Sequence, residues 1–155
     1  LREGLWHQAG RLGRTDVCEY LKSRGVLNLL DTRLKHRYQP GIGWTPLHFA
    51  VRHGQEGAAR WMVDNGADVN TVGSGNLSLF ITACEYTSPS FVEALAGKVV
   101  PEHLTMCDDG GRSAMRAAFT RRQGWLPVVR VLILGGVLAE PGDFPATSQA
   151  RRICE

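Results

Sequence analysis

The stretch Gly43-Trp-Thr-Pro-Leu-His-Phe-Ala50 decides the fold, because it contains a helix start and the first turns of that helix. Thr45 is a good N-cap residue, and Pro46 stands at the first helical position, where the N–H that proline lacks has no helical partner to lose. Apolar residues then recur with helical spacing as far as Val51. The pattern predicts a helix of about two turns that ends at Gly54.

A second helix is predicted directly after the first. Ala58-Ala-Arg-Trp-Met-Val63 supplies its apolar side, and Gly66 is suited to a left-handed C-terminal cap. Residues 43–70 as a whole resemble the ankyrin repeat, whose signature Thr-Pro-Leu-His-x-Ala recurs about every 33 residues. The resemblance implies helix-turn-helix units that stack in a row and are joined by β-hairpin-type finger loops.

The same pattern recurs along most of the chain. Ser78-Leu-Phe-Ile-Thr-Ala83 aligns with the first helix, Val17-Cys-Glu-Tyr-Leu-Lys22 aligns with the second helix of an earlier unit, and Gly111-Arg-Ser-Ala-Met-Arg-Ala-Ala118 begins a fourth unit. We therefore expect an all-α ankyrin-repeat solenoid of about four units over residues 1–141. Its boundaries are repeats at about 1–25, 43–75, 76–108 and 109–138, an insertion at 26–42, and a C-terminal tail or cap at 142–155.

The units depart from the signature at its histidine. His48 preserves it and His7 keeps it in the first unit, whereas Ile81 and Arg116 replace it in the third and fourth units. In the family this imidazole ties neighbouring turns by hydrogen bonds, so we expect the last two junctions to be looser or packed differently. In the third unit the second helix should stop at Gly97, which leaves residues 98–104 as an irregular or short helical link.

The insertion admits two interpretations. It makes the connection before Thr45 eight residues longer than the one before Ser78, and insertions in such folds map to loops on one face, commonly the binding face. In the first interpretation, basic and aromatic side chains form a contact for a partner beside Trp44. In the second, a solvated loop covers the first unit with its leucines. The leucines concerned are Leu27, Leu29, Leu30 and Leu34.

The resemblance also implies that partners bind on a concave side lined by finger loops and first helices. By register we expect first-helix positions such as Phe49, Thr82 and Ala117 to be exposed there. The surface mixes aromatic and basic residues, and Tyr, Trp and Arg dominate binding energy at protein interfaces. The predicted partner-binding residues are Arg33, His36, Arg37, Tyr38, Trp44, Phe49, Arg52, His53, Tyr86, Arg121 and Arg122.

The composition excludes several other classes of protein. A formal net charge of +3 over 155 residues argues against a strongly basic arm, and 43% apolar residues indicate a folded domain. No apolar run approaches the roughly 20 residues of a membrane span. We interpret the four widely spaced cysteines as reduced and mostly buried, which favours an intracellular, reducing compartment, the cytoplasm before an organelle.

No catalytic motif is present, so we predict no enzyme activity, no cofactor and no metal site. The preferred function is a non-enzymatic interaction module or scaffold that binds a protein partner of unknown identity. The alternative is a structural subunit of a large, organellar or ribonucleoprotein, assembly. Nucleic-acid contact through basic residues ranks last, because phosphate binding normally needs a dense basic patch.

The two ends of the chain raise separate questions. Because the chain begins at Leu1 without Met, we interpret it as a fragment or a processed protein. The last predicted helix has almost no polar position, although terminal units of solenoids need a polar outer face. We expect residues 141–153 to fold back as a cap, with Thr147 starting a short helix. A continuing chain or a docked partner would serve the same purpose.

Overall fold

The computed structural model describes residues 4–35, 42–121, 123–138 and 143. Within these residues the chain is helical, and one isolated antiparallel bridge joins Val72 to Ser78. The helical elements are α1 (Leu5–Leu12), α2 (Thr15–Ser23), the 3-10 turn η1 (Leu27–Leu29), α3 (Pro46–Arg52), α4 (Glu56–Asp64), the 3-10 turn η2 (Ser74–Asn76), α5 (Leu79–Tyr86), α6 (Pro89–Ala96), α7 (Pro101–Thr105), α8 (Ala114–Phe119) and α9 (Trp125–Leu134).

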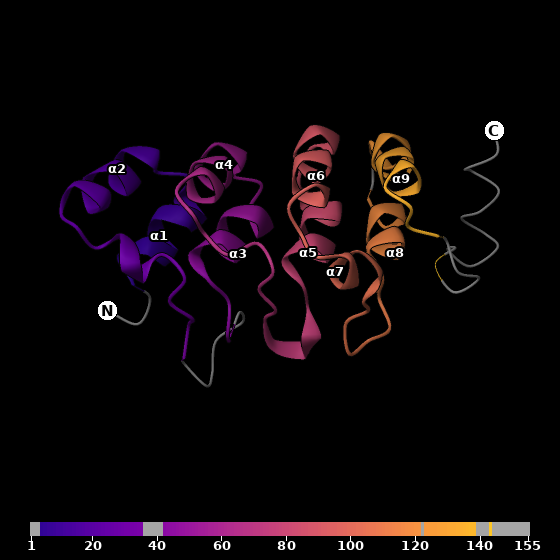
Figure 1. Cartoon of the computed structure of the whole chain (residues 1–155), viewed down its shortest axis with the longest axis horizontal. Coiled ribbons are helices and arrows are strands. Elements are labelled where there is room, and N and C mark those ends of the chain that lie inside the picture. The colour runs from indigo at the N-terminus through magenta and orange to yellow at the C-terminus, as the bar shows by residue number, and fades with distance from the viewer. Residues whose placement is uncertain (1–3, 36–41, 122, 139–142, 144–155) are drawn as a thin grey trace.

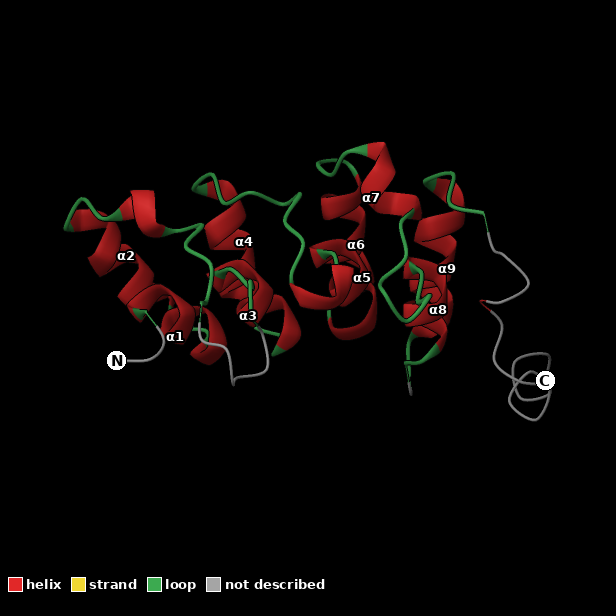
Figure 2. Ribbon diagram, turned by 90° about the horizontal axis from the view of Figure 1, so that it is seen from below, coloured by secondary structure: helices red, strands yellow, loops and turns green. Residues whose placement is uncertain are grey.

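The main helices form two layers that run along the long axis of the molecule (Figure 1). In the first layer α3 packs between α1 and α5, and α5 packs between α3 and α8. In the second layer α2, α4, α6 and α9 each pack against the first-layer helix that precedes them in the chain. Figure 2 shows the helix pairs following one another from α1 and α2 to α8 and α9. The arrangement confirms the predicted all-α solenoid.

Capping side chains and glycines mark the ends of the helices. The side chain of Ser78 accepts a hydrogen bond from the amide of Ile81 at 3.1 Å and so caps α5. Gly54 and Gly66 follow α3 and α4 with φ angles of 68° and 92°, values that favour glycine because it lacks a Cβ. Both predicted helix ends in the second unit are thereby confirmed.

Residues 79–84 of α5 form a continuous buried segment. Every side chain in it is buried, including the polar Thr82, because α5 has first-layer neighbours on both sides and α6 behind it. Thr82 satisfies its hydroxyl within the helix by donating to the Ser78 carbonyl at 3.1 Å. The centre of the stack is therefore the centre of the apolar core.

The third unit contains the short helical link that its sequence predicts. Its second helix, α6, ends at Ala96 with Gly97 as the C-cap, and α7 occupies Pro101–Thr105. Trp125 is the first residue of α9 and packs 5.6 Å from Phe119, measured between ring centroids. The capping glycine before it, Gly124, has a φ of 69°.

The loops that connect successive units form three fingers on one side of the stack (Figure 1). We call them finger 1 (residues 31–44, described only at 31–35 and 42–44), finger 2 (residues 70–78) and finger 3 (residues 106–113). Backbone hydrogen bonds join neighbouring fingers, from Ser74 to the Ile42 carbonyl at 3.0 Å and from Asp109 to the Gly75 carbonyl at 2.8 Å. Backbone hydrogen bonds thus fix each finger next to the following one.

The insertion packs against the first unit through some of its leucines. Leu30 and Leu34 are buried, and Leu27 is partly buried against the core, whereas Leu29 is 47% exposed. The amide of Leu34 also donates to the Trp44 carbonyl at 3.0 Å, which pairs the two arms of finger 1. The packing interpretation of the insertion therefore holds for three of its four leucines.

The C-terminal end of the described stack is apolar. Ile133, Leu134 and Leu138 are 60%, 77% and 82% exposed. Asp143 is buried and accepts a hydrogen bond from the Ser113 hydroxyl. The predicted cap helix at Thr147 lies outside the described residues. No helix in the described part of the chain is long and apolar enough to cross a bilayer.

Candidate partner-binding surface

The ends of two neighbouring first-layer helices, α3 and α5, carry a connected set of polar side chains. Arg52 is the last residue of α3 and Tyr86 is the last residue of α5, in neighbouring units. The guanidinium carbon of Arg52 lies 4.0 Å from the centroid of the Tyr86 ring, a cation–π contact. Among the described residues Arg52 has no carboxylate partner. The contact therefore orients a charge that remains available to another molecule.

A polar network continues from Tyr86 toward finger 3. The Tyr86 hydroxyl donates to Oε1 of Glu85 at 2.7 Å, and Nη1 of Arg112 donates to Oε2 of Glu85 at 2.6 Å. Nε of Arg112 also donates to Oδ2 of Asp108 at 3.1 Å. These bonds fix Glu85 between Tyr86 and Arg112, so this end of the surface presents side chains in set positions.

The network shifts the pKa values of its own members. Burial raises the pKa of Tyr86, and the hydrogen bond to Glu85 and its charge raise it further. Burial also works to raise the pKa of Asp108, but hydrogen bonds from Arg112 and Gly110 to the ionised form outweigh it, and the net shift is downward. Tyr86 is thus a phenol donor and Asp108 a carboxylate acceptor at neutral pH.

Sequence reasoning missed Arg112 and Asp108 as members of this surface. They lie in finger 3, outside the first-helix positions that the register selects. Their local signal is the spacing of an acid and a base four residues apart across a glycine turn, where Asp108 Oδ1 accepts from the amides of Gly110 and Arg112 at 2.9 Å each. That spacing alone does not reveal the contact to Glu85 in another unit.

Arg121 has a structural role in addition to any contact with a partner. It is half-buried, and its Nη1 donates to the carbonyls of Cys84 at 3.0 Å and Thr87 at 2.7 Å. These carbonyls belong to the end of α5, where the last turn of a helix leaves acceptors unpaired. Arg121 therefore caps the neighbouring unit. Arg122, predicted beside it, lies outside the described residues.

Arg33 ties finger 1 to finger 2. It is exposed, and its Nη1 donates to the Val72 carbonyl at 2.6 Å and to the Gly43 carbonyl at 3.3 Å. His36, Arg37 and Tyr38, which were predicted to form the tip of finger 1, lie outside the described residues.

Trp44, a predicted partner-binding residue, is a half-buried side chain at the base of finger 1. Its ring stacks on His48 at 6.0 Å and meets the edge of Phe49 at 5.4 Å, both measured between centroids. It also lies against Gly73 of finger 2, where a Cβ would collide with the indole. Part of the Trp44 ring remains accessible beside the first-layer helices.

The predicted exposure of Phe49 is wrong. Phe49 is 5% exposed, and its ring meets His7 edge-on at 5.6 Å between centroids. The same register error applies to Thr82 and Ala117, which are also buried. These positions face the adjacent first-layer helix, whereas the exposed positions are those at the helix ends, such as Arg52 and His53. Phe49 therefore belongs to the core.

The signature histidine is buried, and its Nδ1 lies within hydrogen-bond distance of three groups. His48 is fully buried, and its Nδ1 lies 3.3 Å from the amide of Thr45, 3.0 Å from the Thr45 hydroxyl and 3.4 Å from the Thr71 hydroxyl. Burial lowers its pKa to about 3, and the positive charge of Arg33 lowers it further. His48 is thus a neutral residue that joins α3 to finger 2, and His7 makes a similar link with its Nε2 3.3 Å from the Trp44 carbonyl.

The junctions that lack the histidine are packed differently. Ile81 is fully buried in place of an imidazole, and Arg116 is exposed. The side-chain amide of Asn76 donates to the Cys107 carbonyl at 3.1 Å and joins finger 2 to finger 3. Hydrogen bonding between these fingers therefore comes from the finger tips.

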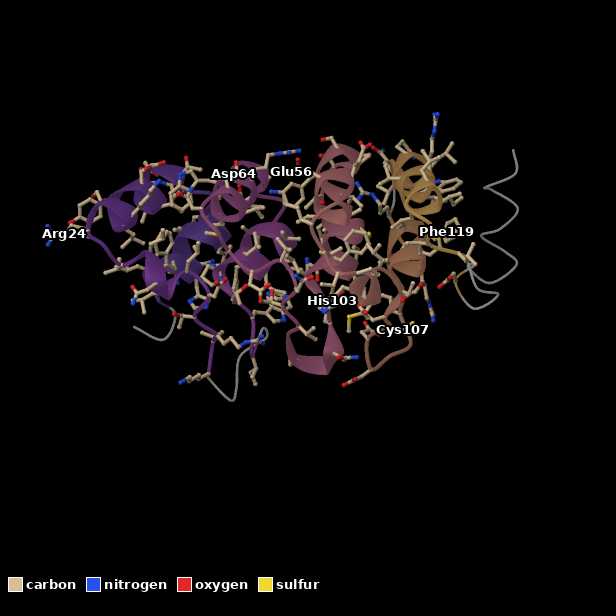
Figure 3. The ribbon with its side chains drawn as sticks, viewed as in Figure 1. Arg24, Glu56, Asp64, His103, Cys107 and Phe119 are labelled. Carbon is tan, nitrogen blue, oxygen red and sulfur yellow. The ribbon has the colours of Figure 1, made fainter. Side chains whose placement is uncertain are left out.

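The second layer is also joined across units. Glu56 of α4 accepts hydrogen bonds from the amide of Ser88 and, at 2.8 Å, from the Ser88 hydroxyl at the start of α6. Figure 3 shows Glu56 between these two helices. The amides at a helix N-terminus have no partner within the helix, so a carboxylate that accepts from them stabilises the structure. Glu56 therefore strengthens the packing of α4 against α6.

The described residues contain no group of three or more His, Cys, Asp or Glu side chains arranged to hold a metal ion. Cys18 and Cys84 are buried, as predicted, whereas Cys107 is exposed. Burial raises the pKa of Cys18 to about 11, and the nearby Asp16 and Glu19 add to the shift. Burial also raises the pKa of Cys84. Both buried cysteines are therefore protonated thiols at neutral pH.

Comparison with known proteins agrees with the stacked helix pairs. Residues 4–73 match the family model described as ankyrin repeats (3 copies), so this part of the chain is similar to the ankyrin-repeat family. The helix pairs beyond residue 73 continue the same two-layer arrangement. No curated protein matches the chain. Ankyrin repeats are general protein–protein interaction modules, and domains built from them are typically non-enzymatic.

Proposed function

We propose that this chain is a non-enzymatic scaffold that binds a protein partner through its fingers and the exposed ends of its first-layer helices. We call this surface the first-helix face. Its described members are Arg33, Trp44, Arg52, His53, Tyr86 and Arg121, and His36, Arg37, Tyr38 and Arg122 are proposed members outside the described residues. Glu85 and Arg112 join the set because they complete the polar network around Tyr86.

The contact between Arg52 and Tyr86 is the observation that carries the proposal. A long side chain loses conformational freedom when it binds, and an arginine already held over an aromatic ring has less freedom to lose. Arg52 also keeps its charge uncompensated among the described residues. The pair suits a partner that presents a carboxylate to Arg52 and an apolar group to the edge of Tyr86.

Arg60 offers a matched control on the second layer. Like Arg52, it is exposed and lies over an aromatic ring of the next unit, with its guanidinium carbon 5.2 Å from the centroid of Phe91. Removing either arginine deletes the same charge and the same kind of stacking. Only Arg52 lies on the first-helix face.

The test is recovery of the partner from a native extract with tagged wild-type, Arg52→Ala and Arg60→Ala proteins. We expect Arg52→Ala to lower the recovery of the partner about tenfold or more, as the loss of an interface hot spot does. The Arg60→Ala protein should recover it as the wild type does. Equal recovery by all three proteins, with unchanged melting temperatures, would remove the first-helix face from the account.

The second candidate function is permanent incorporation into a larger assembly. It is favoured by the exposed apolar side chains of α9 and the residues after it, among them Leu126, Ile133 and Leu134. Under this alternative the purified chain would associate through α9, and Leu134→Glu would release it. A monodisperse monomer in analytical ultracentrifugation, with no change on Leu134→Glu, would exclude the alternative.

A further inference from the structure

A cavity of about 670 Å³ opens at the N-terminal end of the stack, on a different surface from Arg52 and Tyr86. Its walls come from α1, α2, η1 and the first arm of finger 1. The apolar part of the lining consists chiefly of Leu5, Trp6, Leu21, Val26, Leu29 and Leu34. We call this cavity the end groove.

The walls of the end groove are held in place by contacts within the protein. The indole N–H of Trp6 donates to the Val26 carbonyl at 3.1 Å and so fixes the start of η1 against α1. The Trp6 ring also stacks on Trp61 of α4, with 5.9 Å between centroids, which anchors this wall in the next unit. The groove is thus a preformed feature of the fold.

The described charged residues that line the end groove are all basic. They are Arg24, Arg33 and Lys35, and no acidic residue is among the described lining. Arg24 and Lys35 are exposed and form no ion pair with a described residue. Arg33 bonds to neutral carbonyls and keeps its charge. Figure 3 places Arg24 at the extreme end of the molecule, beyond the helices.

The shape of the end groove favours a helix as its occupant. Leu5, Tyr20 and Leu29 on its walls are 57%, 60% and 47% exposed, so the groove is too open to enclose a small molecule as ligand pockets do. Within the stack α3 is covered on its two sides by α1 and α5, and α5 is covered by α3 and α8. Among the described residues α1 has a first-layer neighbour on one side only, that of α3 (Figure 1).

We propose that the end groove binds an amphipathic helix of a partner protein, with apolar residues on one side and Asp or Glu on its flanks. The apolar side would cover Leu5, Tyr20 and Leu29, and the acidic flanks would meet Arg24 and Lys35. Helix-in-groove binding uses apolar anchors at helical spacing, and complementary charge sets orientation and association rate. This second binding surface goes beyond the proposed function. It shares Arg33 with the first-helix face but does not depend on Arg52 or Tyr86.

The test uses three fluorescent synthetic peptides of about 18 residues, long enough for a helix of about five turns. All three carry leucine on one helical side, and their other positions are filled with Glu, Lys or Gln respectively, with alanine as spacer. Fluorescence anisotropy measures their affinity for the full chain at low and moderate salt. We expect the Glu peptide to bind on the order of tenfold more tightly than the Lys peptide, and to weaken as salt rises.

Variants then locate the site. Leu29→Glu should abolish binding of the Glu peptide, and Arg24→Glu combined with Lys35→Glu should weaken it on the order of tenfold. The matched controls at the opposite end are Leu134→Glu and Arg130→Glu, which carry exposed side chains of the same kinds and should bind as the wild type does. Circular dichroism confirms that each variant is folded. The Arg52→Ala protein should also bind normally, which separates this test from that of the first-helix face.

Four outcomes would overturn the proposal. Equal affinity for the Glu and Lys peptides would show that charge plays no part. Loss of binding in Leu134→Glu and not in Leu29→Glu would place the site at α9. Saturable binding of decanoate, with no binding of any peptide, would make the groove a site for a small amphiphile. Dimerisation that Leu29→Glu prevents, again with no peptide bound, would make the occupant a second copy of the chain.

Discussion

His48 shows at the residue scale how a polar side chain serves a mainly apolar core. It is fully buried, yet its Nδ1 lies within hydrogen-bond distance of the Thr45 amide and of the hydroxyls of Thr45 and Thr71. A buried polar group left without partners would destabilise the fold by about 1–3 kcal/mol. Because its partners lie in both α3 and finger 2, His48 stabilises a junction and not only a helix start.

The lowered pKa of His48 predicts a specific dependence of stability on pH. The unfolded chain takes up a proton near the ordinary value of 6.5, whereas the folded protein does not until about pH 3. The unfolded state therefore binds more protons between these values, and stability falls as the pH drops through that window, by up to about 1.4 kcal/mol per pH unit. Below the window both states are protonated and the effect is complete.

Urea unfolding at pH 7, 6 and 5 of the wild type and His48→Asn checks this prediction. The variant should be less stable at pH 7 by about 1–3 kcal/mol, because its amide does not reproduce all contacts of the imidazole. Its stability should also change less between pH 7 and 5, since it has lost the titrating group. Carboxylates such as Asp16, whose pKa the Arg14 hydrogen bond lowers to about 2, act only at lower pH. Parallel pH profiles for the two proteins would contradict the assignment.

The site was predictable from the sequence only where exposure follows from position at a helix end. Arg52 fulfils the prediction of an exposed first-helix position and Tyr86 is half-buried, whereas Phe49, three residues before Arg52 on the same helix, is buried. The 3.6-residue period identifies the apolar face of a helix. It does not show how much of the helix surface the adjacent units bury. Arg112 was missed because its contact with Glu85 crosses from one unit to the next.

At the scale of elements, the close approach of α1 and α3 depends on a glycine. Gly10 lies in α1, where a Cβ would collide with the backbone carbonyl of Pro46 and crowd the methyl group of Met62. The carbonyl belongs to the first turn of α3 and has little freedom to move. Gly10 therefore permits the first two units to pack closely.

Gly10→Ala and Gly57→Ala form a matched pair of helix substitutions. Gly57 lies in α4, and a Cβ there would meet nothing within 4 Å. We expect Gly10→Ala to destabilise the protein by about 1–3 kcal/mol through overpacking. Gly57→Ala should be neutral or stabilise it by up to about 1 kcal/mol, because alanine has the higher helix propensity. Thermal and urea unfolding measure both. A stability loss of equal size in the two variants would show that α1 and α3 adapt to the added methyl group.

The helices were predictable because the residues at each helix end determine where that helix begins and stops. Thr45 with Pro46 starts α3, and Ser78 caps α5 through its own side chain. The arrangement of the fingers was not predictable in the same way. Their hydrogen bonds join residues of different units, such as Ser74 to Ile42 and Asn76 to Cys107, and no local pattern encodes those partners.

At the scale of the whole molecule, each unit packs against its neighbours in the stack. The two ends of the described stack have different surfaces. The N-terminal end has the apolar groove with basic residues around it, and the described C-terminal end has the exposed leucine and isoleucine side chains of α9. A repeat period predicts that units stack, but it contains no information about the ends, where the period stops. The end groove arises from the insertion, the part of the chain that departs from the period.

Hydrogen–deuterium exchange of the complex with the recovered partner tests most directly that recognition takes place on the first-helix face. We predict that the partner slows exchange at the ends of α3 and α5, near residues 52–55 and 86–88, and in finger segments 42–44 and 107–112. Segments 64–68 and 96–99, which end the second-layer helices α4 and α6, should exchange as in the free protein. Protection confined to these second-layer segments would contradict the account.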